Sequence, residues 1–82
     1  MLTFEQALRV AAEHFGEPFA RDGWEDDGAL LVTPQRVVDD ERRGLVEIGA
    51  PWIVVDRASG EIETWPTLPH LDRVRAMRRV VS

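Results

Sequence analysis

Cysteine is absent from the 82 residues of the chain. This absence excludes disulfide bonds, thiol nucleophiles and thiolate metal ligands. Long apolar runs are missing as well, since none approaches the roughly 20 residues that span a bilayer. The chain also lacks the charged start and apolar segment of a signal peptide. We therefore expect a cytoplasmic protein that has no membrane partner.

Residues that could carry catalysis or hold a cofactor are scarce. The two histidines, His14 and His70, lie in different predicted helices and form no metal-binding pair. Ser59 lies in a predicted loop and Ser82 is the last residue, and neither has a recognisable base and oxyanion hole. The six glycines are scattered singly, which excludes a glycine-rich phosphate loop. We expect no enzymatic activity, no metal and no cofactor.

Positive charge is scarce over most of the chain. The chain has fifteen acidic residues and ten arginines, and the formal net charge is -5. Four of those arginines, Arg73, Arg75, Arg78 and Arg79, lie in the last ten positions. Arg75 and Arg79 would share one face of a helix and could bind nucleic acid, but a solvated face fits better beside so acidic a body. We expect no nucleic acid and a protein partner with a basic contact surface.

Two acidic clusters are candidate contacts for such a partner. The first is Glu25, Asp26 and Asp27, and the second is Asp39, Asp40 and Glu41. The alternative is that both are solvated loops. Neither has the spaced ligands of an EF-hand calcium loop, so we expect no metal there.

A capping box predicts where the first helix begins. The run Thr3-Phe4-Glu5-Gln6 places a threonine three residues before a glutamine. Apolar residues such as Leu8, Ala11 and Phe15 recur at helical spacing, and Gly16 follows as a helix stop. The sequence therefore predicts an amphipathic helix over residues 4–15.

The middle of the chain gives weaker signals. Residues 29–33 predict a strand that ends or bends at Pro34, and residues 36–38 could continue it after the bend. The other segments are predicted to be a strand fragment with an acidic turn over 17–28, a charged loop over 39–44, a strand or helical turn over 45–48, and a break over 49–51.

A hairpin is the clearest feature of the sequence. Residues 52–56 are β-rich, residues 57–60 form a short loop that contains a glycine, and residues 61–65 alternate between polar and apolar. Closing the hairpin with Asp56 opposite Glu61 pairs Val55 with Ile62, Ile53 with Thr64, and Trp52 with Trp65.

Alternation then places Trp52 and Trp65 on one face of the sheet, together with Glu61 and Glu63. Because two glutamates are poor core residues, we expect the helices to cover the opposite, aliphatic face and leave the tryptophan pair open. Tryptophans are favoured anchors at interfaces, so the pair is a candidate surface for a partner or a homodimer. The alternative is a cross-strand pair that only stabilises the sheet.

A second helix is predicted after Pro66, with its cap at Thr67 or Leu68. Its apolar stripe would be Leu71, Val74, Met77 and Val81. The order of helix, antiparallel strands and helix is typical of one α+β domain over residues 1–82. We expect about three to four strands with both helices packed on one sheet face. The expected core consists of Phe4, Leu8, Phe15, Ile53, Val55, Ile62, Leu71 and Val74.

Several segments resemble a known family when they are taken in order. They are Thr3-Phe4-Glu5-Gln6-Ala7-Leu8, Pro51-Trp52-Ile53-Val54-Val55-Asp56, Ser59-Gly60-Glu61-Ile62, and Leu68-Pro69 with Leu71 and Val74. Together they are similar to the bacterial YrhB-like family, also called immunity protein 35. The resemblance covers most of the chain but leaves out residues 34–50. It implies a bacterial protein that binds and blocks a secreted toxin inside the producing cell, and it brings no catalytic motif.

The first hypothesis is therefore an immunity protein that acts as an antitoxin by binding a cognate toxin domain. A second is a chaperone-like or self-associating domain that uses the same open sheet face. A third is a small nucleic-acid-binding module that uses the arginine-rich last helix.

Overall fold

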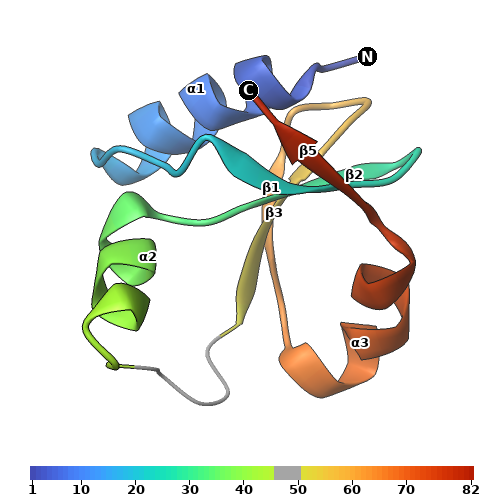
Figure 1. Ribbon diagram of the computed structural model, residues 1–82. Coiled ribbons are helices and arrows are strands. Elements are labelled where there is room, and N and C mark those ends of the chain that lie inside the picture. The colour runs from blue at the N-terminus through green and yellow to red at the C-terminus, as the bar shows by residue number, and fades with distance from the viewer. Residues whose placement is uncertain (46–50) are drawn as a thin grey trace.

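The computed structural model describes residues 1–45 and 51–82 of the chain. In order, these residues form helix α1 (Phe4–Phe15), strands β1 (Asp22–Glu25) and β2 (Ala29–Val32), helix α2 (Gln35–Arg42), strands β3 (Trp52–Asp56) and β4 (Ile62–Trp65), helix α3 (Thr67–Ala76) and strand β5 (Arg78–Val81). All strand pairs are antiparallel, and the sheet order is β4-β3-β2-β1-β5 (Figure 1). The α+β class is confirmed, with five strands in the described residues where three to four were expected.

Helix α1 begins and ends where its sequence predicts. The Thr3 hydroxyl accepts from the Gln6 amide at 3.2 Å, and the Gln6 side chain accepts from the Thr3 amide at 2.9 Å. Gly16 ends the helix in the left-handed conformation, with φ of 67°. The helix packs its apolar stripe on one side of the sheet, the α1 face. The buried residues of this layer are Phe4, Ala7, Ala11, Phe19, Leu30, Val32 and Val55.

The predicted hairpin register is confirmed. The pairs are Trp52 with Trp65, Ile53 with Thr64, Val54 with Glu63, and Val55 with Ile62. The expected core is confirmed in part. Phe4 and Val55 are buried, and Leu8, Ile53 and Ile62 are half-buried against the same cluster. Val74 is half-buried against the cluster on the other face, and Leu71 is half-buried. Phe15 is the exception at 39% exposed. It lies in the last turn of α1, where its ring contacts those of His14 and Phe19.

The expectation that both helices share one face is wrong. Helix α1 lies on one side of the sheet and α3 lies on the other (Figure 1). The physical reason is topological, because β4 and β5 are opposite edges and the helix that joins them must cross a face. Since α1 already covers the first face, α3 takes the second, called here the α3 face. Its buried residues are Ala29, Leu31, Val54, Trp65 and Met77.

The last helix is shorter than its apolar stripe predicts. It ends at Ala76, Met77 is extended, and Arg78–Val81 pairs with β1 as strand β5. Val80 lies opposite Gly23 and packs against the α1 face. The apolar residues after Ala76 have helical spacing in the sequence, but these residues form a strand because they pair with β1.

The segment after Pro34 is also different from its prediction. Gln35–Arg42 forms helix α2, where a strand extension and a charged loop were predicted. Pro34 stands at the N-cap, and the Gln35 side chain donates to Asp39 one turn later at 3.2 Å. The strand fragment predicted within 17–28 is confirmed as β1. The predictions for residues 45–48 and 49–51 fall largely on residues 46–50, outside the described part of the chain. No helix in the described part is long and apolar enough to cross a membrane.

Candidate protein-binding face

Helix α3 covers only part of its face of the sheet. Beside it lies a groove of about 640 Å³ between α2 and α3. Its lining includes Trp24, Thr33 and Trp52 from the sheet side, Val38 and Glu41 from α2, and Leu71, Val74 and Arg75 from α3. We call this surface the tryptophan groove. A concave apolar surface that carries tryptophans on a rigid sheet is the kind of site that holds a protein partner.

Trp24 is the most accessible aromatic residue of this groove, at 41% exposed. It lies in β1 opposite Leu31 on one side and Arg79 of β5 on the other. Exposed Val81 points to the same face, two residues along β5 from Arg79. The sequence pattern alone predicted no role for Trp24. The signal that could have identified it is a single large aromatic residue in the short polar strand Asp22–Glu25. That signal can be interpreted only when β1 is known to pair with β2 and with β5.

Trp52 and Trp65 lie opposite each other as predicted, but they differ in exposure. Trp52 is half-buried and lines the groove, whereas Trp65 is 6% exposed. The Trp65 ring stacks on His70 at 4.7 Å, and the Arg73 guanidinium lies 4.5 Å from its centre. The expectation that both tryptophans are open is therefore wrong for Trp65, which instead anchors α3.

The two glutamates of the hairpin do not exclude burial of this face. Glu61 and Glu63 are exposed because they lie along the sheet edge, where their carboxylates reach water beside the covered region. Glu63 also accepts the Trp65 indole N–H at 3.1 Å. A glutamate on a covered face can stay in water when its strand is at the edge of the sheet. The sequence alone did not show that this strand is an edge.

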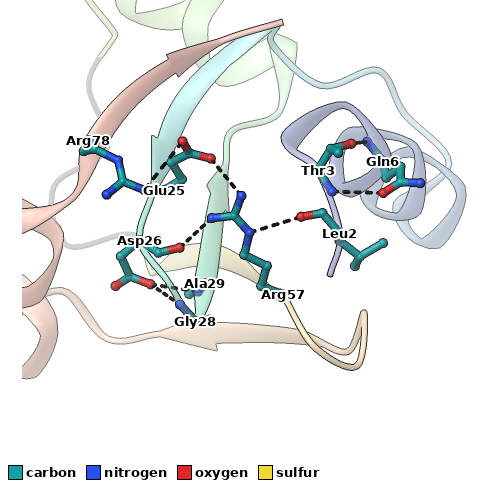
Figure 2. Close-up of polar contacts among 9 residues, drawn as sticks. All are labelled: Leu2, Thr3, Gln6, Glu25, Asp26, Gly28, Ala29, Arg57 and Arg78. Atoms are coloured by element: carbon teal, nitrogen blue, oxygen red, sulfur yellow. Dashed lines mark hydrogen bonds and ion pairs between the residues drawn. The ribbon is translucent and has the colours of Figure 1, made fainter.

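Glu25 of the first acidic cluster lies inside an internal polar network (Figure 2). Its carboxylate contacts Arg57 at 3.5 Å and Arg78 at 3.9 Å. Arg57 also donates to the backbone carbonyls of Leu2 at 3.1 Å and Asp26 at 2.8 Å. The guanidinium thus joins the chain start, the β1–β2 turn and the hairpin loop, so Glu25 is engaged within the domain.

Asp26 likewise acts within the domain. It accepts from the amides of Gly28 at 2.9 Å and Ala29 at 2.8 Å, which caps the β1–β2 turn (Figure 2). Arg73 of α3 donates to its other oxygen at 3.0 Å. This side-chain hydrogen bond from Arg73 is the main cause that holds the pKa of Asp26 below its ordinary value, while partial burial opposes it. Asp27 is exposed and has no hydrogen-bond or ion-pair partner among the described residues.

The second acidic cluster lies on helix α2, where a loop was expected. Asp39 accepts from Gln35, as described above, and Asp40 is half-buried. Glu41 is exposed at the rim of the tryptophan groove. Neither Asp40 nor Glu41 has an ion-pair partner within the described ranges. Of the two clusters, this second one therefore contributes a carboxylate, that of Glu41, to the rim of the tryptophan groove.

The arginines near the chain end do not form the helical row on which nucleic-acid binding depended. Arg73 is held by Asp26 and Trp65, and Arg75 lines the tryptophan groove. Arg79 lies in β5 and pairs with Asp22 at 3.3 Å. Arg75 and Arg79 therefore do not share a helix face, and that expectation is corrected.

In the part of the chain that the structure describes, no group of three or more His, Cys, Asp or Glu residues is placed to hold a metal ion. Comparison of the chain with protein-family models, with curated proteins and with solved structures finds no match.

Proposed function

We propose that this domain is a non-catalytic immunity protein that binds and neutralises a cognate bacterial toxin in the cytoplasm of the producing cell. The observation that carries the proposal is the tryptophan groove, where Trp24 and Trp52 stand on a rigid sheet between two helices. Tryptophans in such positions contribute large shares of binding energy in protein interfaces. The resemblance of the hairpin and the first helix to the YrhB-like family supports a toxin as the partner.

Charge supports a basic contact surface on that partner. The chain carries a formal net charge of -5. Glu41 at the rim of the groove and Asp40 beside it in α2 have no ion-pair partner among the described residues. Unpaired acids at the rim of an apolar groove attract and orient a basic protein, while the apolar floor provides most of the affinity.

A co-expression experiment tests this function. The proposal expects a secreted toxin to be encoded beside this gene, and that toxin is produced in bacterial cells with and without the chain. The proposal expects growth arrest without the chain, rescue with it, and co-purification of the two proteins in equimolar amounts. Growth arrest that persists despite a soluble, folded chain would overturn the immunity function. Self-association of the chain through the groove, with no toxin complex, would favour the self-associating alternative instead.

A further inference from the structure

Strand β4 is an edge of the sheet, and its outer side has no strand partner among the described residues. The Asp56 amide donates to the Glu61 carbonyl at 2.8 Å, which makes these two residues a hydrogen-bonded pair. In an antiparallel ladder such pairs alternate with non-bonded ones. The N–H and C=O groups of Ile62 and Thr64 therefore point away from β3. They form a row of donors and acceptors that can take one more strand.

The side chains along this edge differ between the two faces. On the α3 face, Glu61 and Glu63 are exposed, and neither forms an ion pair within the described ranges. Glu63 accepts the Trp65 indole N–H at 3.1 Å and interacts electrostatically with Arg73, while its exposed position leaves it open to a further cation. On the other face, a shallow groove runs between α1 and the edge. It is lined by Val10, Glu13, His14, Gly60, Glu61 and Ile62. An added strand would thus meet Glu61 and Glu63 on one face and, on the other, a strip in which Val10 and Ile62 lie beside Glu13 and His14.

The charges select the kind of strand that can be added. Two β4 edges cannot pair with each other readily, because glutamates would lie across from glutamates. We infer that this edge binds an extended segment of another protein in which basic residues alternate with aliphatic ones. The basic side chains would face Glu61 and Glu63, and the aliphatic ones would lie against Val10 and Ile62. This inference goes beyond the proposed function, because the edge and the tryptophan groove have different lining residues.

Charged residues on edge strands also serve to prevent aggregation. A purely protective role and a binding role differ in one respect. A protective edge rejects every added strand, whereas the edge described here accepts a basic strand and rejects an acidic one. The distinction can be measured with peptides and does not require the toxin.

The test is an NMR titration of the isotope-labelled chain with the peptide Lys-Val-Lys-Val-Lys-Val-Lys, capped at both ends. The inference expects shifts and slowed hydrogen exchange at the Ile62 and Thr64 amides. Glu61→Gln with Glu63→Gln should weaken binding by about tenfold, because two cross-strand ion pairs contribute about threefold each. Asp27→Asn with Asp72→Asn removes the same net charge elsewhere and should leave binding within about twofold.

Three results would overturn the inference. The first is an absence of shifts at the β4 edge at any peptide concentration. The second is equal binding by a peptide with Glu in place of each Lys, or by one with the same residues arranged as four Lys followed by three Val. The third is equal weakening by both double variants. Because the peptide replaces the toxin, failure here leaves the proposed immunity function intact.

Discussion

At the scale of single residues, Asp26 forms its contacts within the domain although it belongs to a cluster of three acidic residues. Its carboxylate joins the β1–β2 turn to α3 through Gly28, Ala29 and Arg73. A sequence shows that acids are adjacent but not which of them a distant arginine will reach. Arg73 follows Asp26 by 47 positions, so local patterns could not assign this pair.

Replacement of Asp26 by Asn should lower the free energy of unfolding by about 1 kcal/mol near neutral pH. In the folded protein, the hydrogen bond from Arg73 holds the pKa of Asp26 below its ordinary value of 3.8. The stabilisation is therefore complete above that value and is lost as the pH falls through the folded-state pKa. In urea titrations, the difference between the parent and Asp26→Asn should be constant from about pH 7 to about pH 5 and should shrink below pH 3.8.

The neighbouring Asp27 offers a matched control. It is exposed and has no hydrogen-bond or ion-pair partner in the described residues. Asp27→Asn should change the free energy of unfolding by less than about 0.5 kcal/mol. If the two substitutions produced the same pH dependence, the ion pair between Asp26 and Arg73 would have no role in stability.

Truncation of Trp65 should destabilise the domain far more than truncation of Trp24. Trp65→Ala removes a buried ring that packs against His70 and Arg73, and should cost about 3–5 kcal/mol of unfolding free energy. Trp24→Ala removes a side chain that is 41% exposed and should cost less, about 1 kcal/mol. Chemical unfolding of both variants measures the contrast. Equal losses would mean that α3 does not bury Trp65 as described.

At the scale of elements, the sequence predicted those helices and strands whose ends are marked by local start and stop residues. Helix α1 has a capping box and Gly16, and the β3–β4 hairpin has a β-rich run, a short loop with Gly60 and an alternating second strand. Helix α2 and strand β5 lack such signals, since α2 has no side-chain cap and β5 depends on pairing with β1. The tryptophan groove needs α2 and α3 on one side of β1, so only part of it could be predicted.

The contact between α1 and β1 depends on the absence of a side chain at Gly23. A Cβ atom there would overlap the Leu31 carbonyl and would lie 2.7 Å from the Phe4 ring. Gly23→Ala should therefore push α1 from the sheet and cost roughly 1–3 kcal/mol, measured by thermal or urea unfolding.

Gly28→Ala is the control for this close approach. A Cβ at Gly28 would meet nothing closer than the Arg73 guanidinium at 3.4 Å. Its effect should stay within about 0.5 kcal/mol. A Gly23→Ala variant as stable as Gly28→Ala would show that α1 is not seated on β1 as described.

At the scale of the whole molecule, each face of the sheet carries a helix, and several exposed acids, among them Asp27, Glu41 and Glu61, form no ion pair among the described residues. Association with a basic partner should then be steered by charge. The association rate constant should fall by about tenfold or more when ionic strength rises from about 0.01 M to about 1 M, because the Debye length shortens from about 30 Å to about 3 Å. Stopped-flow measurements would detect this fall. A rate constant indifferent to salt would exclude acidic steering.

The central claim is that the tryptophan groove binds the partner, and Trp24 tests it most directly. Isothermal titration calorimetry would compare the parent, Trp24→Ala and Phe15→Ala for binding to the protein encoded beside this gene. Phe15 is a matched control, because it is 39% exposed against 41% for Trp24 and does not line the groove. The account predicts that Trp24→Ala raises Kd by about thirtyfold, as for an aromatic hot spot, while Phe15→Ala leaves Kd within about threefold. Equal Kd values for Trp24→Ala and the parent would contradict it.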